Sequence, residues 1–208
     1  MKYVPQRYIP KSLSKKDKKK QRKELIKSRK AYKNKIYHTR KKVKSFKSKF
    51  SPHIQKALNM YKLKKFSLNN ELVKKTKCKM VGLKKIFKKG MGAYFSSGSR
   101  PNQTPHSWAY ARLASGITGG KASAVDYNIL NENCSKNSKA LKLAKKAYIK
   151  YKKGRMRVKQ VKLKGGKWSK KYKKSINCKK PKGFSQRQYC KYGRKTKKKK
   201  IQKKRKTK

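Results

Sequence analysis

Apolar residues recur at helical spacing through the middle of the chain, and cap residues mark where the helices are expected to begin. A helix places every third or fourth residue on one face, so this spacing predicts amphipathic helices. Serine, threonine or proline stands before most of the apolar runs, as is typical of helix starts. The pattern predicts helices over residues 14–35, 52–64, 68–76, 80–89, 104–117, 121–131 and 138–152.

Glycines are expected to end several of these helices, among them Gly90 and the pair Gly119 and Gly120. Helices 68–76 and 80–89 follow each other across a short joint, an arrangement that resembles a helix-turn-helix pair. The joint lacks the glycine usual in that turn. Two interpretations therefore stay open for the pair: docking on DNA, or ordinary helix packing.

Apolar residues become sparse toward both ends. The helix from Ser14 is expected to form fully only on a partner, and the last 50 or so residues show no sustained period. We therefore expect an all-α fold in which a small helical domain spans residues 51–152. A basic arm (1–50) and a basic tail (153–208) would flank it, both lysine-rich and largely disordered.

Charge is the strongest compositional signal. The 208 residues include 70 Lys and Arg but only 5 Asp and Glu, for a formal net charge of +65. Five carboxylates cannot neutralise this excess, so an external polyanion is expected, and nucleic acid is the densest one. Lysines outnumber arginines by 59 to 11, which favours neutralising phosphates over reading bases. There is no apolar run of about 18 residues, so no transmembrane segment is expected.

The lysine bias stops between residues 91 and 134, where the net charge is +1 over 44 residues. Because this segment has few lysines and almost no net charge, it is expected to be a packed unit. Arg112 and Asp126 are expected to pair within it as a structural contact. The serines and glycines of this stretch predict an anion nest of backbone N–H groups, unless the glycines only allow tight backbone geometry. The nest would consist of Gly90, Gly92, Ser96, Ser97, Gly98 and Ser99.

The remaining predicted contacts to nucleic acid are basic side chains, with one tryptophan that could stack on a base. They are Lys84, Lys85, Lys88, Lys89, Arg100, Arg112, Lys121, Lys145, Lys146, Arg155, Arg157, Trp168, Lys197, Lys198, Lys199 and Lys200.

The sequence offers few residues that could form a catalytic site or bind a metal ion. His106, Asp126 and the serines of the SSGSR run (Ser96, Ser97 and Ser99) could in principle serve hydrolysis, but a lone histidine in a helix's first turn is more typical of a cap or a surface residue. Cys78, Cys134, Cys178 and Cys190 form no CxxC pair and are expected to be free thiols. Cys178 and Cys190 have no histidine nearby, and two ligands alone cannot complete a zinc site. We therefore predict no catalytic residue, metal or cofactor.

A long run of this sequence resembles an uncharacterised domain of large nucleocytoplasmic DNA viruses of algae and protists. The shared residues are Gly90 to Pro105, Ser107-Trp108, Ala111 to Ser115 and Thr118 to Tyr127, within a resemblance that covers roughly residues 50–135. Ile176 to Lys195 resembles a short tail element of proteins from the same viruses. The resemblance brings no activity or catalytic residues. It implies a viral origin and a role in the virion or with the genome.

Together these observations predict a viral DNA-binding structural protein that neutralises and packages genome phosphates largely without sequence specificity. It is expected in the virion, and in the host nucleus or a cytoplasmic virus factory. The alternatives are a minor capsid or scaffold protein whose basic arms face the genome, and an enzyme of unknown reaction. Capsid proteins are therefore also candidate partners, and charge alone does not distinguish DNA from RNA.

Overall fold

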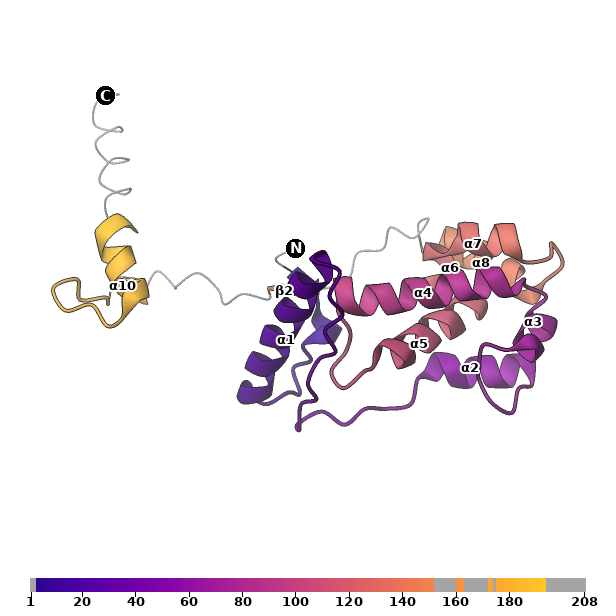
Figure 1. Cartoon of the computed structure of the whole chain (residues 1–208), viewed down its shortest axis with the longest axis horizontal. Helices are drawn as coiled ribbons and strands as arrows, with labels where there is room; N and C mark the ends of the chain where they lie inside the picture. Colours follow the sequence, from indigo (N-terminus) through magenta and orange to yellow (C-terminus); the bar gives the residue numbers. More distant parts are fainter. Residues whose placement is uncertain (1–2, 152–159, 163–171, 174, 194–208) are drawn as a thin grey trace, which may run out of the picture. The chain divides into compact units, whose positions relative to one another are not determined.

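The computed structural model of the chain is mostly helical (Figure 1), and it describes residues 3–151, 160–162, 172–173 and 175–193. These residues fall into two units, divided between residues 164 and 165. Within the described part of the chain, no helix has the length and apolar character needed to cross a bilayer.

The helices of the first unit begin close to where the sequence predicts. Ser14, Thr104 and Ser138 each accept a hydrogen bond from the backbone N–H three residues on, as expected of N-caps. The elements are β1 (Tyr3–Pro5), η1 (Gln6–Tyr8), α1 (Lys15–Lys33), α2 (Pro52–Tyr61), α3 (Asn70–Thr76), α4 (Met80–Ser96), α5 (Pro105–Ile117), α6 (Lys121–Val125), α7 (Tyr127–Asn133), α8 (Lys139–Lys150) and β2 (Gln160–Lys162). The helix predicted over 121–131 is thus two short helices, α6 and α7.

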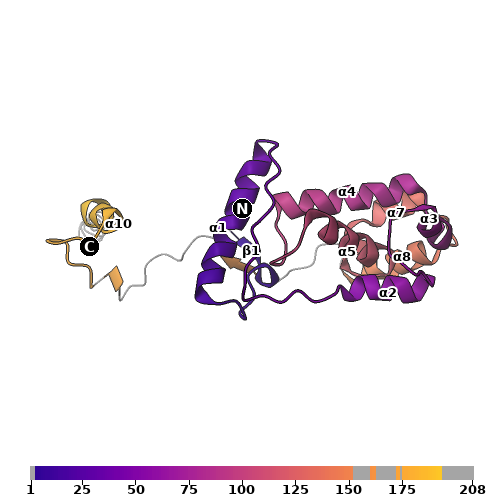
Figure 2. The same cartoon turned by 60° about the horizontal axis from the view of Figure 1, so that its bottom comes forward.

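Helix α5 is the centre of the first unit. It lies between α2 and α4 in both views of Figures 1 and 2, and it also contacts α6 and α8. Its apolar residues Leu113, Ala114 and Ile117 are fully buried. The sequence predicts that Gly90 ends α4, but the helix continues to Ser96. A Cβ at Gly90 would lie 2.6 Å from the Cα of Ala109, so this glycine instead lets the backbones of α4 and α5 approach closely.

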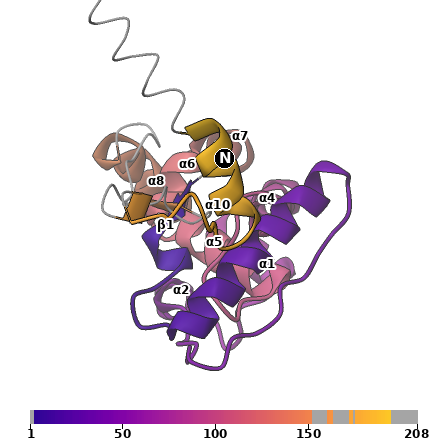
Figure 3. The same ribbon diagram turned by 90° about the vertical axis from the view of Figure 1, so that its left-hand side faces the viewer.

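A second apolar cluster orders the N-terminal segment, so the expected disorder of residues 1–50 is wrong. Val4, Tyr8, Ile9, Leu13, Leu25 and Val43 are buried together, with Trp108 of α5 packed against them. Strand β1 also pairs antiparallel with β2, with Val4 opposite Val161. The small sheet means that the fold is mostly helical rather than all-α. Figure 3 shows α1, which contacts α4, on the side that faces the viewer.

The four cysteines form disulfides, so the prediction of free thiols is wrong. Cys78, between α3 and α4, bonds to Cys134 at the end of α7, and Cys178 bonds to Cys190. The first pair is 56 residues apart in sequence. The fold brings the two segments together through backbone hydrogen bonds from Lys79 to Asn133 and from Ser135 to Lys77.

The second unit contains a short helical segment, and the Cys178–Cys190 disulfide joins its end to the residues before it. Helix α10 (Phe184–Gln188) continues into a π-helix, η3 (Tyr189–Gly193). The Gln186 amide donates to the Tyr172 hydroxyl at 2.9 Å, and Ile176 is buried. Most of the predicted disordered tail, including Arg155, Arg157, Trp168 and Lys197 to Lys200, lies outside the described residues.

Candidate nucleic-acid interface

Every exposed residue of α1 is a lysine. The helix buries Asp17, Gln21, Leu25 and Ser28, which recur at helical spacing and therefore share one face. The exposed positions are Lys15, Lys16, Lys19, Lys20, Lys23, Lys27, Lys30 and Lys33. With a rise of 1.5 Å per residue, these eight side chains extend along about 27 Å. We call this set the α1 lysine face.

Sequence reasoning did not select the α1 lysine face as a site. The signal was present, because the lysines avoid the positions that Gln21, Leu25 and Ser28 occupy. Its meaning depended on knowing that α1 packs on the rest of the fold. A helix free in solution would expose all its residues, whereas docking fixes one face outward.

Helices α4 and α8 also turn lysines outward. Most of the basic residues predicted as contacts in the first unit are exposed: Lys84, Lys85, Lys88, Lys89, Arg100, Lys121, Lys145 and Lys146. On α8, Lys139, Lys142 and Lys150 join them. Helix α4 is the second helix of the pair that resembles a helix-turn-helix, and DNA docking by this pair stays a prediction.

Two of the predicted contacts, Arg112 and Lys89, bind a buried carboxylate, and Arg112 does so through two hydrogen bonds. Its Nε and one terminal nitrogen each donate to Asp126 at 2.8 Å, and the Asp126 side chain is 0% exposed. Lys89 also reaches Asp126, at 3.1 Å. The predicted structural pair is thus confirmed, and Arg112 is bonded within the fold. His106 is exposed in the first turn of α5, with its ring 6.0 Å from that of Phe87.

The predicted anion nest of Gly90, Gly92, Ser96, Ser97, Gly98 and Ser99 falls on the last turns of α4 and the residues just after it. The first three lie inside α4, where backbone N–H groups are bonded along the helix. The N–H groups of Ser97 and Gly98 both donate to the carbonyl of Ala93 at 3.0 Å. Ser99 is buried and accepts a hydrogen bond from Arg40. The amides of Ser97 and Gly98 therefore complete the end of α4.

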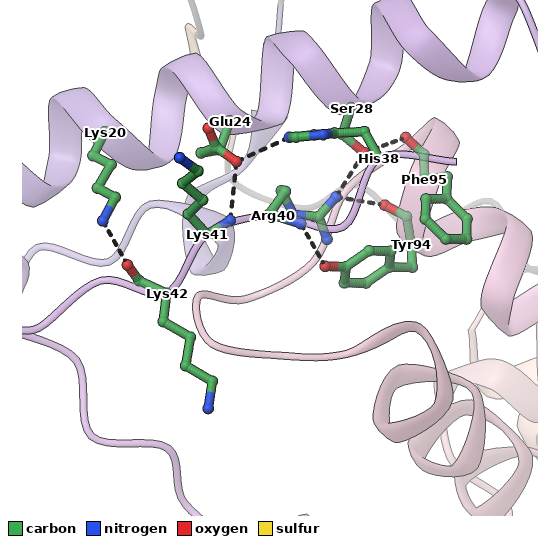
Figure 4. Close-up of polar contacts among 9 residues, drawn as sticks. All are labelled: Lys20, Glu24, Ser28, His38, Arg40, Lys41, Lys42, Tyr94 and Phe95. Atoms are coloured by element: carbon green, nitrogen blue, oxygen red, sulfur yellow. Dashed lines mark hydrogen bonds and ion pairs between the residues drawn. The ribbon is translucent and has the colours of Figure 1, made fainter. Parts of the chain in front are cut away.

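Buried Arg40 fixes the segment between α1 and α2 (Figure 4). Its guanidinium donates to the hydroxyls of Ser28 and Ser99 and to the carbonyl of Tyr94, and lies 3.6 Å from the centre of the Tyr94 ring. Its backbone N–H donates to the Tyr94 hydroxyl. Burial lowers the pKa of Arg40 from its ordinary value. The residue thus ties the segment to both α1 and α4.

Two carboxylates of α1 hold the same segment. Glu24 accepts hydrogen bonds from the backbone N–H of Lys41 at 2.9 Å and from the His38 ring at 3.0 Å. Asp17 accepts both the N–H and the hydroxyl of Ser45, each at 2.7 Å. Burial alone would raise the pKa of Glu24, but the bonds from Lys41 and His38 bring it below its ordinary value. The Ser45 bonds lower the pKa of Asp17.

The acids are therefore mostly turned inward while the lysines point outward. Asp17, Glu24 and Asp126 bond within the fold, and of the chain's five acids only Glu71 and Glu132 are exposed. An exposed lysine surface with so few carboxylates carries a strongly positive potential. Such a surface attracts phosphate groups.

A hollow of about 800 Å³ opens at the start of α1. Its lining residues are Ser14, Lys16, Asp17, Lys19, Lys20, Lys23, Lys44 and Ser45. The Asp17 bonds to Ser45 hold its two walls together. Five lysines around one hollow can contact several phosphate oxygens at once, so the hollow belongs to the same candidate interface.

Residues 5–133 match the model of a family of unknown function, DUF5824. The match includes α1 and the segment after it and ends at the last residue of α7, so it begins well before the span of roughly residues 50–135 noted from sequence. Comparison with curated proteins and with solved structures gives no match.

Proposed function

The chain belongs to DUF5824, a family of unknown function, and we propose that it is a viral structural protein that binds and neutralises genome DNA. The observation that supports this function best is the α1 lysine face, on which every exposed position carries a cation. Because α1 is docked through its other face, the ammonium groups point outward before any ligand arrives.

The predominance of lysine favours contact with phosphates. A lysine ammonium is a hydrated point charge without the planar fork that arginine uses to recognise guanine. Binding through such groups is governed by release of counterions, so it depends little on sequence and strongly on salt. At full charge matching, 65 positive charges correspond to roughly 30 base pairs of duplex.

The viral setting of the proposal rests on the sequence resemblance described above. The run from Gly90 to Tyr127 resembles domains of large DNA viruses, whose genomes are long duplexes in need of neutralisation. We therefore propose DNA as the polyanion and the virion as the place where the protein works.

The test is a salt titration of binding to a 30-base-pair duplex, with the full chain and a variant carrying Lys16→Gln, Lys19→Gln, Lys23→Gln and Lys27→Gln. Glutamine keeps helix propensity, so α1 should persist. The slope of log affinity against log salt should decrease in magnitude by about 2 to 4 in this variant, since each phosphate contact contributes about 0.9 to that slope.

The matched control removes four exposed lysines from α2, α3 and the loop between them: Lys56→Gln, Lys64→Gln, Lys74→Gln and Lys75→Gln. Its slope should change by less than about 1. Equal changes in the two variants would show that α1 is not the interface. A nearly flat slope for the unmodified chain would overturn nucleic-acid binding altogether.

A further inference from the structure

Two apolar side chains are exposed where the lysine-rich helix α1 ends. Tyr37 is 68% exposed and its neighbour Ile36 is 60% exposed. They directly follow Lys33, Asn34 and Lys35, all of them exposed. An adjacent apolar pair on a lysine-rich surface is unexpected for a face whose only partners are water and phosphate.

The Tyr37 ring packs against two other aromatic rings of the fold. It packs edge-on against Phe95 of α4, with ring centres 5.1 Å apart, and lies 6.0 Å from the ring of Tyr32 on α1. The residues after it are fixed by the His38–Glu24 contact and by buried Arg40. The ring is therefore exposed on one side and supported by two other rings on another, which lowers the entropic cost of stacking on it.

Tyr37 also lies where two lysine-bearing helices meet. On α1, the last lysines of the α1 lysine face are Lys30 and Lys33. On α4, Lys88 and Lys84 precede Phe95 by seven and eleven residues, close to two and three full turns, so they share its face of the helix. Ser28 of α1 donates to the Phe95 carbonyl, which joins the two helices at this point.

We propose that Tyr37, with Ile36 beside it, stacks on an unpaired base of a single strand whose phosphates contact the lysines of α1 and α4. The proposal rests on the proposed function and names the form of nucleic acid this site prefers. Every base has a π-face, so an aromatic platform adds affinity without sequence preference. A continuous duplex hides those faces, so only a single strand or an opened duplex can use Tyr37.

The test compares two 20-nucleotide probes with equal numbers of phosphates, oligothymidine and the same strand with abasic sites throughout, at 150 mM salt. The unmodified full chain should bind oligothymidine about 10-fold more tightly, as expected for stacking on one base. Tyr37→Ala should remove this preference and leave affinity for the abasic strand and for duplex DNA unchanged. Tyr37→Phe should retain the preference because the ring is kept.

Phe50→Ala is the matched control, since Phe50 is 67% exposed but carries no part of the proposed platform. It should leave the preference intact. Equal affinity of the unmodified chain for the two probes would overturn the proposal without any variant. A parallel loss on both probes in Tyr37→Ala would do so as well. Neither result touches the salt dependence of duplex binding, which tests the lysine faces separately.

Discussion

At the scale of single residues, lysine occupies backbone positions where glycine is usual. Lys35, Lys62 and Lys77 stand at or just beyond the C-terminal ends of α1, α2 and α3, with φ of 58°, 51° and 53°. The left-handed conformation costs a residue with a Cβ roughly 1 kcal/mol or more. A cation at a helix C-terminus returns part of that cost by interacting with the helix dipole. Positive charge is thus present even where the backbone favours a smaller residue.

Lys62→Gly should therefore stabilise the fold. We expect the free energy of unfolding to rise by about 0.5 to 1 kcal/mol, because glycine adopts positive φ without steric cost. Urea unfolding followed by circular dichroism measures the change. Lys64→Gly, two residues on at a site without positive φ, should leave stability unchanged or lower it. A fall in stability of equal size in both variants would contradict the argument.

At the scale of elements, the segment between α1 and α2 is held mainly by hydrogen bonds from other elements. Glu24 and Asp17 of α1 hold its middle, and Asn102 bonds to the backbones of Val43 and Phe46. The segment contains little regular structure of its own. Its order depends on charged and polar groups as much as on burial of Val43.

Acid should release this segment before the helical core unfolds. The pKa values of Asp17 and Glu24 are lowered from ordinary values of 3.8 and 4.5, so their stabilisation is complete above those values. It is lost as the pH falls through the lowered values. Hydrogen-exchange protection at the Lys41 and Ser45 amides should begin to drop once the pH falls below the ordinary values of 4.5 and 3.8, while that at Leu113 in α5 persists. Unchanged protection at all three would contradict this account.

The sequence predicted elements whose signals are local and missed features that depend on distant contacts. Caps at Ser14, Thr104 and Ser138 located helix starts because a cap acts within four residues. Order before residue 50 was missed because its few apolar residues, which lie as far apart as Val4 and Val43, form one cluster that Trp108 of α5 and Val161 pack against. The exposed lysines of α4 and α8 followed from helical periodicity. The α1 lysine face did not, because nothing local shows that α1 is docked.

At the scale of the whole molecule, charge opposes compaction. A net charge of +65 spread over 208 residues repels itself, and the buried carboxylates compensate only near their own sites. The folded state concentrates these charges more than the unfolded chain does. Anything that neutralises the surface should therefore stabilise the fold.

A polyanion should raise the melting temperature more than simple salt does. Inorganic polyphosphate at low micromolar concentration should raise Tm by several degrees in 20 mM buffer, because it binds the concentrated charge of the folded state. Sodium chloride should need to reach hundreds of millimolar for a similar shift, since it acts by screening alone. Differential scanning calorimetry measures both. A melting temperature insensitive to either would show that repulsion does not limit stability.

The inward placement of Asp17, Glu24 and Asp126 has a consequence for encounters between copies of this chain. A neighbouring molecule finds few acidic side chains to pair with its own ammonium groups, so two copies meet as like-charged bodies. Close spacing of many copies then requires a long polyanion running between them. Such copies would act as large multivalent counterions, and the length of the polyanion would set how many copies can gather.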